Sequence, residues 1–134
     1  MLMMLMLFSN FAHAASLDDC SVSLAMAKAS GYTVLWKDED VLSKDASKTF
    51  SFPVVKDKSY YAFACGNSRA IDIDLFVFKW GIKKQKVLTI VEDVKADPRP
   101  IVWFSQSKDI HLGLQITMTR SRGDAEYTVY VVEK

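Results

Sequence analysis

Two aspartates, Asp72 and Asp74, stand in an otherwise apolar stretch that reads IDIDLFVF. Successive side chains of a β-strand point to opposite faces, so a strand here places both carboxylates on one face. A second acidic stretch, VEDVKADPRP, contributes Asp93 and Asp97 from what reads as a loop. Carboxylate oxygens that converge from a strand end and a neighbouring loop are the ligands that Ca²⁺ prefers. The sequence therefore predicts a calcium site formed by Asp72, Asp74, Asp93 and Asp97.

A structural role for the same aspartates is the alternative. Carboxylates at the start of a strand accept hydrogen bonds from backbone N–H groups or from a neighbour such as Arg69, and they discourage pairing with a foreign sheet edge. The four aspartates also lack the regular ligand spacing of a dedicated calcium loop. The sequence alone is compatible with both roles.

A second candidate site is the basic segment FKWGIKKQK. It gathers Lys79, Lys83, Lys84 and Lys86 around Trp80 and contains no acidic residue. A cationic hairpin tip of this kind is suited to an anionic glycan, a lipid headgroup or an acidic protein surface. Charged hairpin tips also serve solubility alone. We predict Trp80, Lys79, Lys83 and Lys84 as the partner-binding residues.

Catalytic patterns are weak in this chain. Ser105 or Ser107 with Asp109 and His111 would supply the residue types of a hydrolytic triad, but neighbouring residues of a strand and turn do not by themselves make that geometry. A Gly-x-Ser-x-Gly elbow, a His-Glu-x-x-His pair and a phosphate-binding glycine loop are all missing from the sequence. We therefore expect a protein that is not an enzyme and that needs no cofactor, with Ca²⁺ as the one exception considered.

The N-terminal residues have the pattern of a secretory signal. Residues 1–14 read MLMMLMLFSNFAHA, an apolar run followed by a small-x-small cleavage pattern. This predicts a signal peptide over residues 1–14, a single domain over residues 15–134, and a periplasmic or secreted protein. No later segment is apolar enough to span a bilayer, so we expect no transmembrane segment in the mature chain.

The two cysteines fit that compartment. Cys20 and Cys65 are the only ones in the chain, and the simplest prediction for an exported protein is one disulfide between them. Two buried free thiols are the alternative. The formal net charge of +1 offers no general attraction to nucleic acid, so the expected partner is a protein or glycan of the cell envelope or extracellular space.

Alternating apolar residues dominate the chain after Gly31. They predict about eight strands, over residues 33–36, 49–54, 59–65, 71–78, 86–92, 100–105, 111–119 and 125–132, with turn residues between them. Within the fourth strand, Ile71 is expected to share a face with the apolar residues that follow it at every second position, and Trp103 is expected in the core or half-buried. Residues 16–30 favour a short helix that stops at Gly31, although their alternating apolar residues also permit a strand. The fold class is thus an all-β antiparallel sandwich.

The strand motifs resemble a family, the bacterial pre-peptidase C-terminal domain and its stand-alone periplasmic relatives. The matching motifs are YAFA, DIDL within the acidic strand, Gly81, the Asp-Pro loop and IVWF, and they cover about two-thirds of the chain. The resemblance implies a β-sandwich that binds a protein or glycan through loops at the ends of its sheets.

Periplasmic lysozyme inhibitors share this general sandwich more distantly, and this resemblance gives the alternative function. In those inhibitors a Ser-Gly-x-Tyr loop occupies the lysozyme cleft. The corresponding stretch here reads HLGL, from His111 to Leu114, without the serine and the tyrosine.

Overall fold

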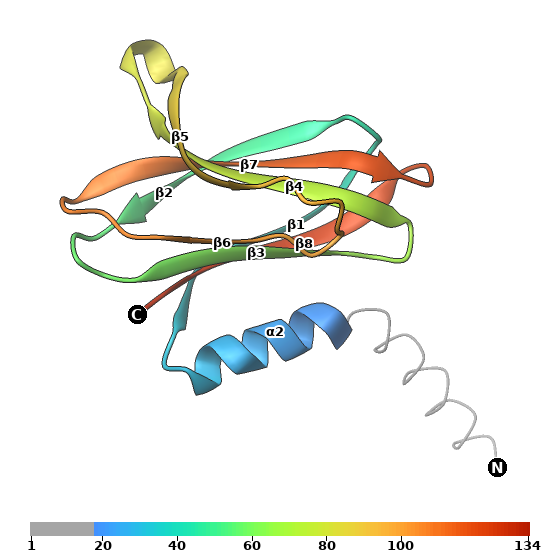
Figure 1. Cartoon of the computed structure of the whole chain (residues 1–134), viewed down its shortest axis with the longest axis horizontal. Coiled ribbons are helices and arrows are strands. Elements are labelled where there is room, and N and C mark those ends of the chain that lie inside the picture. The colour runs from blue at the N-terminus through green and yellow to red at the C-terminus, as the bar shows by residue number, and fades with distance from the viewer. Residues whose placement is uncertain (1–17) are drawn as a thin grey trace.

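Two antiparallel four-stranded sheets face each other in this protein (Figure 1). The computed structural model describes residues 18–134, except for the side chains of Asp18, Asp19, Lys84 and Val87, so the predicted signal peptide over residues 1–14 lies outside the described residues. The elements are α2 (Asp18–Ala29), β1 (Thr33–Leu42), β2 (Ser47–Val54), β3 (Tyr60–Gly66), β4 (Ala70–Trp80), the short 3-10 turn η1 (Ile82–Lys84), β5 (Lys86–Asp93), β6 (Ile101–Phe104), β7 (Ile110–Ser121) and β8 (Ala125–Glu133).

The strand orders are β1-β8-β3-β6 in one sheet and β2-β7-β4-β5 in the other. The core lies between the sheets, where side chains such as Leu75, Ile116 and Val129 are fully buried. Two packed sheets require side chains that alternate between the buried face and the outward face along each strand. The predicted all-β sandwich is confirmed.

Helix α2 covers the outer face of the first sheet (Figure 1). Cys20, Leu24 and Ala27 recur at helical spacing and pack against the side chains of Tyr61 and Tyr130, among others. The predicted disulfide is confirmed, because Cys20 is bonded to Cys65 at the end of β3 with an S–S distance of 2.04 Å. The bond therefore attaches the helix to the sandwich.

The chain leaves α2 where the sequence predicts. Gly31 adopts a φ of +89°, in the left-handed region that glycine favours after a helix. Tyr32 N then donates to Ala27 O at 3.0 Å and closes the last turn. Within residues 18–134 no helix combines the length and the apolar character needed to cross a membrane.

Three details of the sequence prediction are wrong. Strand β1 runs on to Leu42 through residues expected to form a loop, because an edge strand tolerates charged side chains that remain in solvent. Ile71 is exposed rather than inward, because the pairing of β4 with β7 shifts register between Ala70 and Ile73. Trp103 is 57 % exposed, since β6 is the outermost strand of its sheet.

Candidate functional site

Asp72 and Asp74 lie at the start of β4, on the outer face of the second sheet. Asp72 pairs with Arg120 of β7, and Asp74 pairs with Thr117. The hydroxyl of Thr119 donates to Asp74 Oδ2 at 2.9 Å. Arg69 forms no described side-chain bond to either carboxylate. The structural role considered above is therefore supported in part, by the hydrogen bond from Thr119.

The pKa of Asp74 is raised above its ordinary value. Burial is the main cause, the hydrogen bond from Thr119 opposes it, and the neighbouring Asp72 carboxylate adds to it. A buried carboxylate beside a second carboxylate resists ionisation, because the charged form loses water and meets a like charge.

The other two predicted calcium ligands have different tasks. Asp93 lies opposite Leu75 and accepts hydrogen bonds from the backbone N–H groups of Lys95, at 3.1 Å, and Ile101, at 3.0 Å. Asp97 accepts from the N–H of Arg99 at 2.7 Å and so closes its own turn. Both aspartates shape the loop between β5 and β6.

The four aspartates therefore do not form one ligand cluster. Among residues 18–134 there is no group of three or more His, Cys, Asp or Glu side chains arranged to hold a metal ion. The calcium site with four carboxylate ligands stays a prediction of the sequence, and the backbone hydrogen bonds that the carboxylates of Asp93 and Asp97 accept do not favour it.

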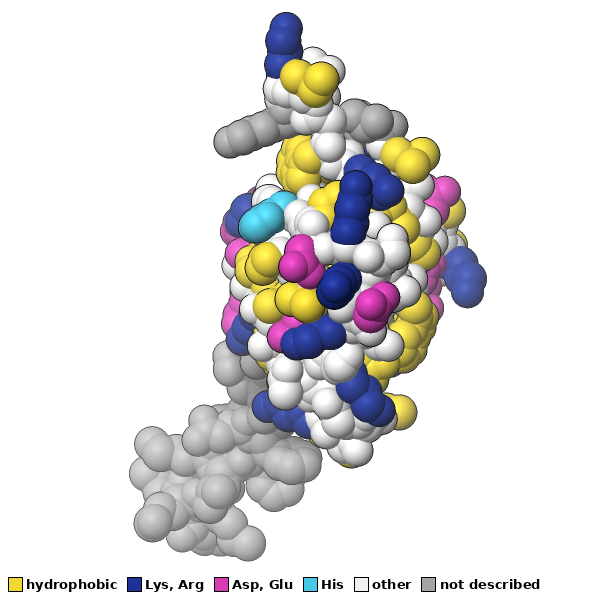
Figure 2. All heavy atoms as spheres, turned by 90° about the vertical axis from the view of Figure 1, so that its left-hand side faces the viewer, with side chains coloured by type: hydrophobic (Ala, Val, Ile, Leu, Met, Phe, Trp, Pro, Cys, Tyr) yellow, Lys and Arg dark blue, Asp and Glu magenta, His cyan; other side chains and the backbone are white. Residues whose placement is uncertain are grey.

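The basic segment forms a hairpin between β4 and β5 that projects away from the second sheet, near one end of the sandwich (Figure 1). Its tip is η1, in which Lys83 has a φ of +68°. Ile82 at the tip is 92 % exposed, and Lys83 beside it is exposed as well. Figure 2 views this end of the molecule, with the hairpin at the top. An exposed apolar side chain beside Lys83 is a feature that sequence periodicity did not single out.

The base of the hairpin is held by aromatic packing. Trp80 is partly buried and its ring meets that of Phe78 edge-on, with centroids 4.8 Å apart. Lys86 Nζ lies 4.8 Å from the centroid of Phe76 and 5.6 Å from that of Phe78. Cation–π contacts of this kind fix the two strands of a hairpin to each other. Of the predicted binding residues, Trp80 thus supports the hairpin, whereas Lys83 lies at its tip.

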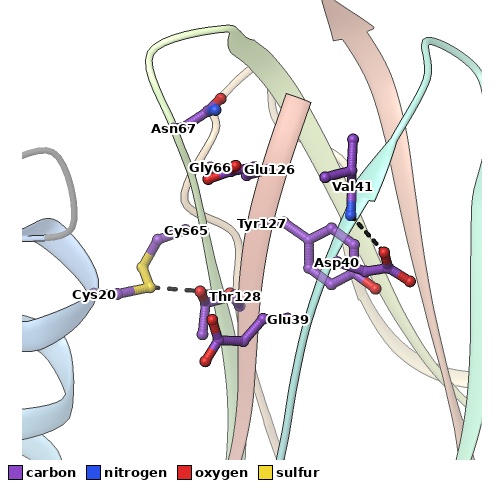
Figure 3. Close-up of a pocket in the computed structure, with 10 residues that line it drawn as sticks. All are labelled: Cys20, Glu39, Asp40, Val41, Cys65, Gly66, Asn67, Glu126, Tyr127 and Thr128. Atoms are coloured by element: carbon purple, nitrogen blue, oxygen red, sulfur yellow. Dashed lines mark hydrogen bonds between the residues drawn. A yellow bond between two sulfur atoms is a disulfide. The ribbon is translucent and has the colours of Figure 1, made fainter. Parts of the chain in front are cut away.

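A pocket of about 260 Å³ lies beside the disulfide (Figure 3). It is lined by Cys20 and Cys65, by residues 39–41 of β1, by residues 66–67 after β3 and by residues 126–128 of β8. Three carboxylates lie in this lining. Glu39 pairs with Lys37 and Asp40 with Lys48, each at 2.6 Å, and the hydrogen bond from Lys48 lowers the pKa of Asp40. Sequence reasoning missed this pocket because it combines four separate segments.

These features occupy different parts of the molecule. Asp72 lies near the first residue of β4 and the hairpin follows its last residue, so they are at opposite ends of the sandwich. The pocket lies on the other sheet. No single site unites the residues that the sequence singled out.

Comparisons with known proteins point to one fold. No family model matches the sequence, and no curated protein matches it either, so the resemblance to the pre-peptidase C-terminal domain stays a prediction. Among solved structures, the chain is similar to PliG of Aeromonas hydrophila, a periplasmic inhibitor of g-type lysozyme. The TM-score is 0.51 and the sequence identity 14 %, over 74 % of this chain and 85 % of the other. The chain shares its sandwich fold with a periplasmic lysozyme inhibitor.

Proposed function

We propose that this protein is an exported, non-enzymatic binding protein whose partner is a protein, and that the partner is a lysozyme, which it inhibits. The projecting hairpin between β4 and β5 is the observation that carries the proposal. The shared sandwich fold and the disulfide between Cys20 and Cys65 support it, because the similar structure is that of a periplasmic inhibitor and disulfides persist in oxidising compartments.

As the segment that enters the lysozyme cleft, the hairpin is favoured over the stretch that corresponds to the Ser-Gly-x-Tyr loop. In this chain the HLGL stretch lies inside β7, where Leu112, Gly113 and Leu114 are buried. A strand interior of this kind cannot enter a cleft. The hairpin does project, and Ile82 at its tip is exposed to solvent.

Charge also favours a glycosidase cleft as the partner surface. The hairpin carries Lys79, Lys83, Lys84 and Lys86 without an acidic residue between Phe76 and Val91. Glycoside hydrolases cleave their substrates with a pair of carboxyl groups at the bottom of a cleft. A cationic tip complements the charge of such a cleft.

The direct test is inhibition of purified lysozymes of the chicken, goose and invertebrate types, measured by the clearing of a cell-wall suspension. We expect submicromolar inhibition of at least one type, with the goose type examined first. No inhibition of any type at high protein concentration removes lysozyme as the partner.

Variants then test the role of the hairpin. The double variant Ile82→Ala, Lys83→Ala should raise the inhibition constant at least about tenfold, because central contacts of an interface carry most of its affinity. Lys108→Ala, an exposed lysine in the turn between β6 and β7, is the matched control and should inhibit normally. Full inhibition by the double variant would keep lysozyme as the partner and exclude the hairpin as the contact.

A further inference from the structure

The carboxyl groups of Asp72 and Asp74 each contain one buried oxygen without a hydrogen-bond partner in the described protein. Asp72 is only 7 % exposed, and its Oδ1 has no hydrogen-bond partner. Oδ1 of Asp74 is also buried without a partner. Burying a charged oxygen without a partner is costly, and the cost is relieved either by a proton shared between the two carboxylates or by a bound cation.

The surrounding side chains do not supply a positive charge. Across the described residues 18–134, neither aspartate takes part in an ion pair. Arg120 is opposite Asp72 in the strand register, but its side chain is exposed. Thr119 donates a single hydrogen bond, to Oδ2 of Asp74, and leaves both Oδ1 atoms without a partner.

We propose that Asp72 and Asp74 together bind one calcium ion on the outer face of the second sheet. Carboxylate and hydroxyl oxygens suit a hard cation, and Ca²⁺ tolerates irregular coordination better than Mg²⁺, which demands near-ideal octahedral geometry. This site uses two of the four aspartates that the sequence suggested, because Asp93 and Asp97 are committed to backbone N–H groups.

The affinity follows from the number of ligands. Two carboxylates and a neighbouring hydroxyl leave the remaining coordination to water, which places the site in the weak class, with a Kd of about 10⁻⁴ to 10⁻³ M. The ion stabilises the start of β4, where the register with β7 shifts. Since the hairpin lies at the other end of β4, calcium is expected to change stability and to leave partner binding unchanged.

The experiment measures the Tm of the purified protein, freed of metal by a chelator, in 0 to 10 mM CaCl₂ at pH 7.5 and constant ionic strength. We expect a rise in Tm of about 5–10 °C for the unaltered protein. Asp72→Asn and Asp74→Asn should each abolish the rise. Glu126→Gln removes a carboxylate from the other sheet and should retain it, as should Asp97→Asn.

Stability without calcium shows that the variants are folded. In chelator, Asp72→Asn and Asp74→Asn should be at least as stable as the unaltered protein, because each removes one of two adjacent like charges. Calorimetric titration of the unaltered protein with CaCl₂ should give about one ion per chain, which tests the site without any variant.

Two outcomes overturn the proposal. The first is a Tm that does not respond to calcium, or that responds equally to CaCl₂ and MgCl₂ in all variants, as ionic screening would produce. The second is a Tm that rises at lower pH while calorimetry detects no calcium binding. That result would mean that the two carboxylates share a proton and do not bind a metal ion.

Discussion

The ring of Phe78 lies directly over Gly113, in the space that a side chain on that glycine would fill. A Cβ atom built on Gly113 would come within 2.3 Å of Phe78 Cζ. Phe78 in turn packs against Trp80 at the base of the projecting hairpin. The glycine of β7 thus gives Phe78 the room it needs to anchor the hairpin.

Gly113→Ala should therefore move Phe78 and loosen the hairpin. Overpacking of a buried contact costs about 1–3 kcal/mol, so the free energy of unfolding should fall by that amount in urea titration. The fluorescence of Trp80 should change as well, since its ring rests on Phe78. Ser51→Ala, at the residue paired with Gly113, is the control, and an equal loss there would argue against this packing.

Breaking the disulfide should destabilise the fold without abolishing it. The bond between Cys20 and Cys65 closes a loop with a sequence separation of 45, which corresponds to about 3–4 kcal/mol of stabilisation on the chain-entropy model. The Cys20→Ala, Cys65→Ala variant should lose that amount in urea titration and keep a strand-rich circular-dichroism spectrum. Reducing agent should lower the stability of the unaltered protein but not that of the variant.

The pair Asp72 and Asp74 should give stability an unusual dependence on pH. The pKa of Asp74 is raised in the folded state, chiefly by burial, so its protonated form favours folding. That contribution is complete below the unfolded pKa of about 3.9 and is lost as the pH rises through the folded pKa. In chelator, Asp74→Asn should therefore be more stable than the unaltered protein at pH 7.5, and the difference should shrink toward pH 4. A difference that does not change with pH would contradict the raised pKa.

The ionisation of Tyr127 should make the stability of the protein depend on pH in the alkaline range. Its hydroxyl donates to Asp38 Oδ2 at 2.7 Å, and burial together with Asp38 holds its pKa well above the ordinary value. Because the unfolded phenol ionises near about pH 10, the stability that this group provides is complete below that pH and falls above it. Tyr127→Phe should cost about 1–2 kcal/mol at pH 8. In Tm measurements from pH 8 to 11 the gap between the two proteins should narrow, and parallel curves would count against this assignment.

The elements of this fold can be predicted from local residue patterns. Alternation of apolar residues locates strands such as β3 and β7, because each strand must bury one face wherever it lies in the sheet. Gly31 ends α2 through its own backbone freedom. The bridge between Cys20 and Cys65 follows from there being no other cysteine in the chain.

The candidate sites depend on contacts that the chain makes with distant segments. The bulge that exposes Ile71 and leaves Asp72 buried arises from the register between β4 and β7. Asp93 does not join the predicted calcium cluster, because its carboxylate accepts a hydrogen bond from Ile101 N, eight residues further on.

The sequence by itself determined the strand periods, the helix stop and the disulfide, because each depends on residue types within one segment or on the only possible pair. The tertiary structure alone decided that Asp72 and Asp74 stay together without Asp93, and that Ile82 lies at the exposed tip of a hairpin. The physical reason is that strand register and hydrogen-bond partners depend on which backbone groups come close in space, and no single segment carries that information.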